Sequence, residues 1–415
     1  MKEMLMKFVE KTGRKSEFKL FFKTYHDLPN IKFAIIKVSG ETLEKKMDLL
    51  AEDIAYLNKL GIYPMVIHGA GSILNQKLPH SKKIGGMRVT SKEDMPIVKE
   101  VFDDISKELV LKIKKYGGSA QHVEGVFSCE RIKKYGYVGN IKKVNVEKIK
   151  KIINKDITPI INPTGVFEDG FLNVNADTAA KELVKEVHPK KFIMLTETGG
   201  ILDEKGDIIS FINLSSKDDF KHITGGMLLK VKEILSFMKD TNGTSIVITS
   251  AEDLLKEIFT IKGSGTFIRY HVINSTKDVH SLDKNKIKKL LEDSFGKKLV
   301  SGYFNNGITD IFYEKNYEAV AILKKINGIS YLDKLAVAKF RQGTGLSKSL
   351  WNNVLKNHKS IVWRAHANNP FNTTYMKVCD GIIKGKEWYF YWINIKEEDI
   401  IPTMNKVIQK EKTLV

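Results

Sequence analysis

The chain has 415 residues, a formal net charge of +19 and a composition that is 42% hydrophobic and 28% charged. This length predicts two domains, and this composition is typical of a folded globular chain rather than of a disordered one. No apolar run approaches the roughly 20 residues of a membrane-spanning helix, so we expect no membrane partner. Met1–Asn30 lacks the apolar segment of a secretory signal, and Cys129 and Cys379 cannot form a metal site alone. These features favour a cytoplasmic protein.

The large positive charge raises the question of a nucleic-acid partner. The lysines are spread along the whole chain, often in pairs beside isoleucine or asparagine, and they form no concentrated basic tail. A distributed charge of this kind favours anionic small substrates, such as nucleotides and carboxylates, over DNA or RNA. We therefore expect no nucleic-acid partner, and a non-enzymatic DNA-binding role is the distant alternative.

Five short apolar runs in the first part of the chain predict buried parallel strands. They are Phe33–Val38, Met65–His68, Pro159–Asn162, Phe192–Thr196 and Ser245–Thr249. Helix-length amphipathic stretches lie between them, among them Glu44–Leu60 and Thr178–Val187. Strand, crossover helix and strand in repetition predict a three-layer α/β/α domain whose ligand site lies at the carboxyl ends of the strands.

The rhythm of the sequence changes after the Gly-Ser-Gly-Thr stretch at Gly263–Thr266. The elements predicted beyond it are a helix, three strands with an antiparallel pattern, and a second helix, at Asn285–Phe295, Thr309–Tyr313, Glu318–Ile326, Ile329–Val337 and Leu346–Leu355. This order predicts a smaller α+β domain. We place the boundary near residue 270, which gives an N-terminal helix at 1–28, a first domain at 29–270 and a second at 271–415.

Two glycine loops follow predicted strands of the first domain. Ile35–Gly40 reads Ile-Ile-Lys-Val-Ser-Gly, and Val66–Gly71 reads Val-Ile-His-Gly-Ala-Gly. Glycines at a strand-to-helix turn let backbone N–H groups approach phosphate oxygens, and the helix N-terminus that follows favours an anion. Neither loop is a P-loop or a dinucleotide fingerprint, and a loop of this kind by itself is more often a tight connection.

Further segments give these loops a context. Gly86–Thr90, Leu172–Asp177, Leu195–Asp203 and Ile223–Val231 resemble motifs of the acetylglutamate kinases within the amino-acid-kinase family, and they stand in the family's order. The resemblance implies that Lys37 and Lys230 neutralise a transferring phosphoryl group and that Asp177 orients both lysines. It also implies that Arg88 holds the α-carboxylate of acetylglutamate and that Asn173 contacts the same substrate.

The same resemblance implies ATP as the phosphoryl donor, and magnesium would arrive with it rather than at a separate metal site of the protein. The residues implied to contact its phosphates are Gly40, Gly69, Gly71, Thr196 and Gly226. Phe259–Thr266 resembles the arginine-effector segment of the family, with Ile261 where that segment carries a histidine. Whether arginine is an effector is therefore left open.

A second resemblance begins where Tyr331–Val337 runs into the Arg-Gln-Gly-Thr-Gly-Leu sequence of Arg341–Leu346. A strand that ends in a Gly-x-Gly turn at a helix N-terminus is a pyrophosphate cradle, and this one resembles motif A of the GNAT acetyltransferases. Phe340 departs from the Arg or Gln of the general pattern. The resemblance implies that acetyl-CoA is bound by the strand and the turn, at Leu335, Val337, Gln342, Gly343 and Gly345. N–H groups of the strand would polarise the thioester carbonyl.

Trp363–Tyr375, Gly381 and the aromatic run Trp388–Trp392 look like the vertebrate-type N-acetylglutamate synthase domain. This implies that Lys334 and Arg364 hold the carboxylates of glutamate, with Arg364 suited to paired bonds. Asn369 would hydrogen-bond the substrate, and Tyr375 would handle a proton or lie near the CoA sulfur. The aromatic run itself predicts a half-buried core strand.

This domain order is similar to that of the bifunctional N-acetylglutamate synthase/kinases. It implies acetyl-CoA-dependent acetylation of the α-amino group of L-glutamate and ATP-dependent phosphorylation of N-acetylglutamate, both in arginine biosynthesis. Two alternatives stay open, namely a synthase whose kinase-like domain is a regulatory arginine-binding module, and a kinase only. Relatives with a leading helix use it to join kinase-domain dimers, so we expect a homo-tetramer or other homo-oligomer. The alternative for Met1–His26 is a helix that lies on its own domain.

Overall fold

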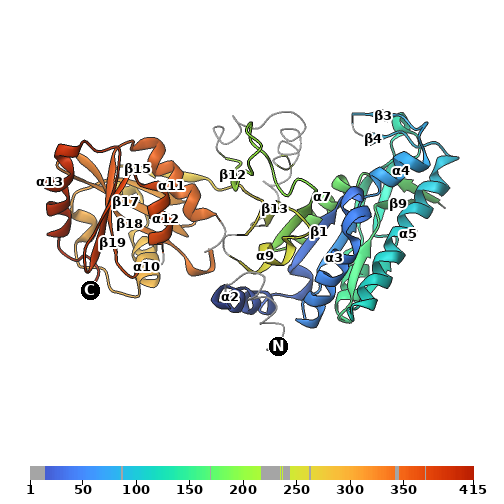
Figure 1. Cartoon of the computed structure of the whole chain (residues 1–415), viewed down its shortest axis with the longest axis horizontal. Coiled ribbons are helices and arrows are strands. Elements are labelled where there is room, and N and C mark those ends of the chain that lie inside the picture. The colour runs from blue at the N-terminus through green and yellow to red at the C-terminus, as the bar shows by residue number, and fades with distance from the viewer. Residues whose placement is uncertain are drawn as a thin grey trace. The chain divides into compact units, whose positions relative to one another are not determined.

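The computed structural model describes residues 15–415 apart from 86, 169, 216–233, 235, 237–243, 261–262, 342–344 and 370. The chain divides into two compact units, with the boundary in the sequence between Tyr270 and His271 (Figure 1). Within the described residues, no helix is both long enough and apolar enough to cross a bilayer.

The first unit is built on an eight-stranded sheet of order β12-β14-β13-β11-β1-β2-β8-β5. Its strands are β1 Ala34–Val38, β2 Met65–His68, β5 Ala120–Val123, β8 Thr158–Ile161, β11 Lys191–Leu195, β12 Phe211–Asn213, β13 Ser245–Thr249 and β14 Thr266–Arg269. The five strands predicted from apolar runs are all present, as β1, β2, β8, β11 and β13. They pair in parallel with one another, which confirms the predicted parallel core.

Helices cover both faces of this sheet. They are α2 Lys15–His26, α3 Gly40–Lys59, α4 Gly71–Lys77, α5 Asp94–Lys115, α6 Val146–Ile153, α7 Ala176–Val187 and α9 Leu254–Phe259. Successive residues of a strand point to opposite faces, so Ile36 of β1 joins the core beneath α3, α5 and α9, while Ile35 joins the core beneath α6 and α7. The first unit therefore has the three layers that the sequence predicted.

Two smaller sheets complete the first unit, and the sequence patterns did not predict them. One has the strand order β10-β9-β6-β7, and the other is the short hairpin β3-β4. Their bounds are β3 Lys83–Ile84, β4 Met87–Arg88, β6 Phe127–Arg131, β7 Gly139–Val144, β9 Thr164–Phe167 and β10 Gly170–Asn173. The hairpin brings Arg88 into the first unit's candidate site, and β10 brings Asn173.

The second unit contains a seven-stranded sheet of order β15-β16-β17-β18-β19-β21-β20. Its strands are β15 Ile273–Thr276, β16 Ile308–Glu314, β17 Ala319–Ile326, β18 Ile329–Val337, β19 Ile361–His366, β20 Gly381–Lys384 and β21 Trp388–Ile393. Its helices are α10 Lys284–Phe295, α11 Leu346–Asn357, α12 Asn372–Val378 and α13 Glu397–Ile408, with a 3₁₀ turn at Tyr303–Asn305. The predicted antiparallel strands and both predicted helices are present.

Strands β18 and β19 pair in parallel over a short length only. Their registered pairs run from Ser330 with Ile361 to Leu332 with Trp363. Strand β18 continues to Val337 and β19 continues to His366, so the two strands part after the pair of Leu332 with Trp363. Beyond this point the edge of β18 that carries Leu335 and Val337 has no registered partner on β19.

Candidate functional sites

The first candidate site lies at the carboxyl end of β1. Lys37 is 8% exposed, and its Nζ atom lies 2.8 Å from Oδ1 of Asp177, which stands in the first turn of α7. The side chain of Asn175 caps that helix by accepting hydrogen bonds from the N–H groups of Asp177 and Thr178. A capped helix holds Asp177 in place, and Asp177 in turn fixes the ammonium group of Lys37.

The two glycine loops approach each other at this point. A Cβ atom added at Gly40 would lie 2.9 Å from the backbone nitrogen of Gly71, so no larger residue fits without displacing backbone. Gly69 faces the side chain of Ala176 across a gap in which an added Cβ would make ordinary contact at 3.6 Å. The N-termini of α3, α4 and α7 therefore converge beside Lys37, and such ends attract anions.

Arg88 and Asn173 lie next to these loops. The guanidinium group of Arg88 donates to Ser81 Oγ at 2.8 Å, to Asn75 Oδ1 at 2.5 Å and to the carbonyl of Gly71 at 3.5 Å. Asn173 Nδ2 donates to Thr90 Oγ1 at 3.0 Å. Arg88 and Asn173, which were predicted to bind acetylglutamate, thus lie on the same side of the domain as the loops that were predicted to bind the phosphates of ATP.

The remaining residues predicted for this site divide into two groups. Thr196 is described, follows β11, and lies 3.3 Å from Thr198 between their hydroxyl oxygens. Lys230 and Gly226 lie outside the described residues. The structure therefore brings Lys37 and Asp177 together and leaves the second predicted lysine as a prediction.

The second candidate site lies where β18 and β19 part. Leu335 and Val337 belong to the stretch of β18 that has no registered partner on β19, and Gly345 caps α11 in the left-handed conformation with φ of 77°. Gln342 and Gly343 lie outside the described residues. A free strand edge next to a helix that begins at a glycine is the arrangement that the motif predicted.

Lys334 and Arg364 have partners in the last part of the chain. Lys334 Nζ donates to Asp333 Oδ2 at 3.1 Å and to Thr413 Oγ1 at 2.7 Å. Arg364 donates to the carbonyls of Val407 at 2.7 Å and Lys410 at 3.0 Å, and its guanidinium carbon lies 4.6 Å from the centre of the Trp388 ring. Both cations that were predicted to bind carboxylates therefore also anchor the segment that follows α13.

Asn369 and Tyr375 sit around α12. Asn369 Oδ1 accepts a hydrogen bond from the N–H group of Phe371 at 2.9 Å, so this side chain shapes the turn before the helix. Tyr375 packs against Trp363, with 5.6 Å between ring centres, and burial raises the pKa of Tyr375 to about 12. The phenol is therefore protonated at neutral pH, which suits a proton donor rather than a base.

Comparison with known proteins assigns both units. The model of the amino acid kinase family matches residues 32–250, which is more than half of the chain. The chain belongs to the amino acid kinase family. Its second unit matches the model for NAT, the N-acetyltransferase of N-acetylglutamate synthase, over residues 273–412. The chain thus combines a kinase domain with an N-acetyltransferase domain, and the two predicted resemblances are confirmed.

Individual relatives match along most of the chain. The acetylglutamate kinase of Xanthomonas campestris is 35% identical over 92% of this chain and 94% of its own length. The mitochondrial N-acetylglutamate synthase of Homo sapiens is 27% identical over 91% of this chain and 71% of its own length. The solved N-acetylglutamate synthase from Neisseria gonorrhoeae, complexed with coenzyme A and N-acetyl-glutamate, has a TM-score of 0.62 at 16% identity. It covers 91% of this chain and 97% of that one, and at this identity it shows the fold alone.

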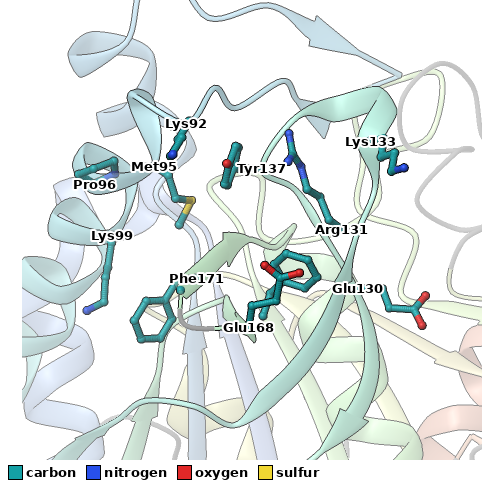
Figure 2. Close-up of a pocket in the computed structure, with 12 residues that line it drawn as sticks. Lys92, Met95, Pro96, Lys99, Glu130, Arg131, Lys133, Tyr137, Glu168 and Phe171 are labelled. Atoms are coloured by element: carbon teal, nitrogen blue, oxygen red, sulfur yellow. The ribbon is translucent and has the colours of Figure 1, made fainter.

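The kinase domain also contains a cavity of about 940 Å³ between the start of α5 and the β6-β7-β9-β10 sheet (Figure 2). Apolar, aromatic and charged side chains line it, among them Met95, Lys99, Arg131, Tyr137 and Phe171. Its wall adjoins the acceptor side of the candidate site, because the N–H group of Asn173 donates to the carbonyl of Tyr137. None of the residues predicted from the sequence lines this cavity.

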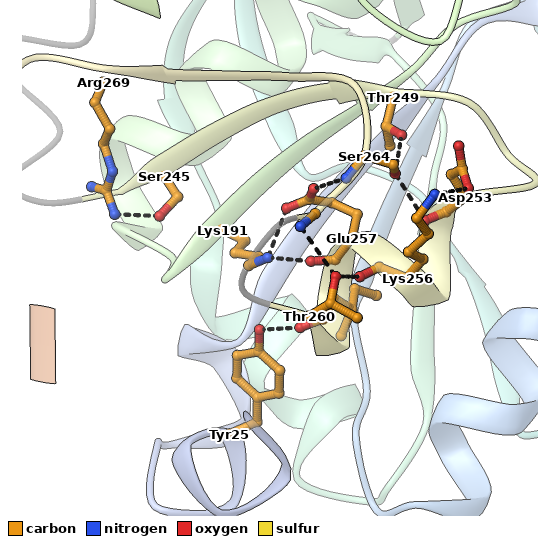
Figure 3. Close-up of polar contacts among 12 residues, drawn as sticks. Tyr25, Lys191, Ser245, Thr249, Asp253, Lys256, Glu257, Thr260, Ser264 and Arg269 are labelled. Atoms are coloured by element: carbon orange, nitrogen blue, oxygen red, sulfur yellow. Dashed lines mark hydrogen bonds and ion pairs between the residues drawn. The ribbon is translucent and has the colours of Figure 1, made fainter. Parts of the chain in front are cut away.

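A buried polar cluster joins α2 to the effector-like segment of the kinase domain (Figure 3). Lys191 Nζ lies 2.8 Å from Glu257 Oε1, and the other carboxylate oxygen of Glu257 accepts a hydrogen bond from the N–H group of Ser264 at 3.0 Å. The hydroxyl group of Tyr25 donates to the carbonyl of Ile258 at 2.6 Å. This places α2 on its own domain, and Ile261 lies outside the described residues.

The acetyltransferase domain holds a set of polar residues that the sequence reasoning missed. Lys324, Tyr303 and Asp333 lie beside Lys334, with Tyr303 donating to Asp333 Oδ2 at 2.6 Å. The sequence of β17 could have indicated that Lys324 is buried. Alternate residues of a strand share a face, and Val320 and Ile322, which precede Lys324 on its face, belong to the apolar core. A lysine that continues an apolar face is a candidate for burial.

Proposed function

We propose that this chain catalyses two reactions of arginine biosynthesis, acetylation of L-glutamate and phosphorylation of N-acetyl-L-glutamate. The observation that carries the kinase half is the ion pair between Lys37 and Asp177 at the meeting point of the glycine loops. The acetyl-transfer half rests on the opening between β18 and β19, with Lys334 and Arg364 beside it.

In the phosphoryl transfer, a side-chain carboxylate oxygen of N-acetylglutamate attacks the γ-phosphorus of ATP. The bond from that phosphorus to the bridging oxygen breaks, and ADP leaves with the electron pair. Negative charge accumulates on the transferring group, so the ammonium of Lys37 and the helix N-termini around Gly40 and Gly71 would stabilise it. Arg88 and Asn173 would hold the acceptor, and Mg²⁺ would enter as part of the ATP substrate.

In the acetyl transfer, the neutral α-amino nitrogen of glutamate attacks the thioester carbonyl carbon of acetyl-CoA. The carbon–sulfur bond breaks, the amine gives up one proton to solvent, and the CoA thiolate takes up one proton. The phenol of Tyr375, which is protonated at neutral pH, would donate the proton to the thiolate and regain one from solvent. The free edge of β18 at Leu335 and Val337 would polarise the carbonyl, and Lys334 with Arg364 would hold the carboxylates.

The test is a pair of assays on one purified sample, with CoA release reporting acetyl transfer and ADP release reporting phosphoryl transfer. We expect both activities in the wild type. Asp177→Asn removes the anion that orients Lys37 and should abolish ADP release alone, whereas Tyr375→Phe should slow CoA release alone. Acetyl transfer without phosphoryl transfer in the wild type would favour a synthase with a regulatory kinase-like domain, and the reverse result would favour a kinase only.

We also propose that arginine acts on the kinase domain at the cluster of Lys191 and Glu257. The support is the buried carboxylate of Glu257, which accepts a hydrogen bond from Ser264 of the effector-like segment. The next residue, Ile258, is hydrogen-bonded to Tyr25 of α2. The N-acetylglutamate synthase from Neisseria gonorrhoeae has also been solved with L-arginine, with a TM-score of 0.58 to this chain at 15% identity. Calorimetric titration of arginine into the wild type and Glu257→Gln tests the proposal, and equal binding by both proteins contradicts it.

The N-terminal residues supply a further proposal, on assembly. We propose that the leading helix joins copies of this chain into a homo-oligomer. Phe18 and Tyr25 are already used within the domain, whereas Phe21 and Phe22 are only partly buried and leave apolar surface. Deletion of residues 1–28 should therefore lower the mass measured by light scattering, and an unchanged mass contradicts the assembly role.

A further inference from the structure

Lys324 of the acetyltransferase domain is a buried cation without an acceptor. The residue is 3% exposed, and no described residue accepts a hydrogen bond from its Nζ atom. Its Nζ atom lies 4.8 Å from the centre of the Tyr303 ring. A buried ammonium group that lacks an acceptor is costly, because neither water nor a protein oxygen replaces its lost hydration.

The charged neighbours of Lys324 are the carboxylate of Asp333 and two further lysines, Lys334 and Lys410. Lys334 Nζ lies 5.5 Å from the centre of the same Tyr303 ring, so the two lysines share one small space. Burial lowers the pKa of Lys324, Asp333 opposes that shift, and Lys410 and Lys334 lower the pKa further. Lys410 Nζ lies 5.6 Å from the centre of the ring of Tyr331, the residue registered with Lys324 between β17 and β18. Arg364 acts on Lys334, and it is the fourth cation of the cluster.

The single carboxylate of the cluster is already engaged elsewhere. Asp333 accepts a hydrogen bond from the Tyr303 hydroxyl at 2.6 Å and one from Lys334 at 3.1 Å. It is therefore the partner of Lys334, and no hydrogen bond joins it to Lys324. The described cluster thus has four cations and one anion. A bound anion with several oxygen atoms would neutralise this excess of positive charge and accept hydrogen bonds from the cations.

Packing offers no reason for a lysine at this position. Val320 and Ile322 precede Lys324 on the same face of β17 and belong to the apolar core beneath α10. An apolar residue of similar length would continue that core without a desolvation cost. The lysine stem could pack in the same way, but the charged end contributes nothing to such packing.

We propose that Lys324 binds a carboxylate of the amino-acid acceptor, next to Lys334 and Arg364. This inference rests on the proposed acetyl transfer to glutamate, which brings two carboxylates into the site while two of the four cations already hold the segment after α13. The product N-acetylglutamate keeps both carboxylates, so the same lysine contacts substrate and product. Lys324 is thus a substrate-binding residue that lies outside the sequence segments from which the acetyltransferase site was predicted.

The experiment replaces Lys324 by methionine, which keeps the length of the side chain and removes its charge. We expect Lys324→Met to raise the KM for L-glutamate by about tenfold or more, the range for a lost hydrogen bond to a charged group. The KM for acetyl-CoA and the rate of ADP release by the kinase domain should stay unchanged. The matched control is Lys325→Met, since Lys325 is the next residue of β17 and is exposed. It should leave the KM for glutamate unchanged.

A second measurement separates binding from folding. Removal of an unpaired buried charge should raise the thermal midpoint of the acetyltransferase domain while glutamate affinity falls. A higher midpoint with an unchanged KM for glutamate overturns the proposal, because Lys324 is then a packing residue only. If Lys324→Met does not fold, Lys324→Gln is measured in its place against the same control.

Calorimetric binding of N-acetyl-L-glutamate distinguishes failure of this inference from failure of the proposed function. For these titrations Arg88→Ala is introduced in every protein, so that the kinase site, where Arg88 would hold the same compound, does not contribute. A background protein that binds the product, together with a Lys324→Met variant that binds it at least tenfold more weakly, supports the inference. Equal binding by the two proteins overturns the inference and leaves the proposed reaction standing. A background protein that neither binds the product nor releases CoA with glutamate overturns both.

Discussion

The two domains balance their buried lysines in different ways. In the kinase domain, Lys37 Nζ lies 2.8 Å from Asp177 Oδ1, so this cation has an anion beside it. In the acetyltransferase domain, Lys324 has no hydrogen-bond partner among the described residues, and Asp333 serves Lys334. A lysine that must face a phosphoryl group in transit needs a fixed position, which a carboxylate provides. A lysine that completes a binding site for carboxylates can instead be unpaired until the substrate binds, and the unpaired charge lowers the stability of the substrate-free domain.

The two sites also differ in what surrounds them. The kinase site is framed by glycines whose backbone atoms approach closely, as Gly40 and Gly71 show. The acetyltransferase site is framed by backbone carbonyls from the end of α13 and the segment after it, which accept hydrogen bonds from Arg364. The two sites belong to different compact units, so substitutions in one site should leave the other reaction untouched.

The largest expected effect comes from Lys37→Met. Loss of one preorganised cation at the transferring group should lower the kcat of phosphoryl transfer by about 10²–10³-fold. Acetyl transfer should be unchanged, because Lys37 and the acetyltransferase residues belong to different compact units. Parallel measurement of ADP and CoA release checks this. An equal loss of both activities in a folded variant would contradict the separation of the two sites.

Acid should affect the kinase domain through His68, which is fully buried at the end of β2 and lies 2.7 Å from Ser106 Oγ. Burial lowers the pKa of His68 from 6.5 to about 4. Between these values the unfolded chain takes up a proton and the folded chain does not, so stability falls as the pH drops from about 6.5 to about 4. The loss amounts to about 3 kcal/mol from this group. Urea unfolding of the wild type and His68→Gln at several pH values measures it, and identical pH profiles would show that His68 contributes nothing.

Arg364→Lys should weaken glutamate binding by about 1.5–3 kcal/mol, because a point charge replaces a forked donor. The same change should lower the thermal midpoint of the acetyltransferase domain, since the carbonyls of Val407 and Lys410 lose their donor. Phosphoryl transfer serves as the internal control. A lower midpoint with an unchanged KM for glutamate would identify Arg364 as an anchor of α13 and not as a substrate ligand.

The smallest effect is expected for Tyr25→Phe. The hydrogen bond from the Tyr25 hydroxyl to the carbonyl of Ile258 links α2 to α9, and its loss should cost about 1 kcal/mol of kinase-domain stability. In a domain of this size that corresponds to a midpoint about 2–4 °C lower. Calorimetric scans would measure the shift, and acetyl transfer should be unaffected. No shift would mean that water satisfies the carbonyl equally well.

The core strands could be predicted from the sequence because each is a short apolar run with loop or turn residues on both sides. Strands β2 and β13 begin and end where the pattern placed them. The sheet of β6, β7, β9 and β10 was missed for the opposite reason. Strand β7 contains no apolar run and fully buries only its two end residues. Strand β9 depends on Gly165, where an added Cβ would lie 2.1 Å from the sulfur of Cys129. Such complementarity between distant residues has no local signal.

The candidate sites show the same limit. Family motifs predicted Lys37 and Asp177, and the structure adds that they form an ion pair. Lys324 was overlooked because it stands in one of the many lysine pairs of this chain, and only its period within β17 marks it as buried. The second role of Arg364 could not be predicted, because its acceptors are backbone carbonyls that every residue carries.

The tryptophans of this chain give one domain a spectroscopic signature of its own. All four, at positions 351, 363, 388 and 392, lie in the acetyltransferase domain. Trp363 is stacked on Tyr391 with 5.2 Å between ring centres, and Arg364 lies over Trp388. Selectively excited tryptophan emission will therefore follow the acetyltransferase domain while the kinase domain stays dark. Glutamate that draws Arg364 away from the Trp388 ring should change that emission, so the native, unlabelled chain reports its own acceptor.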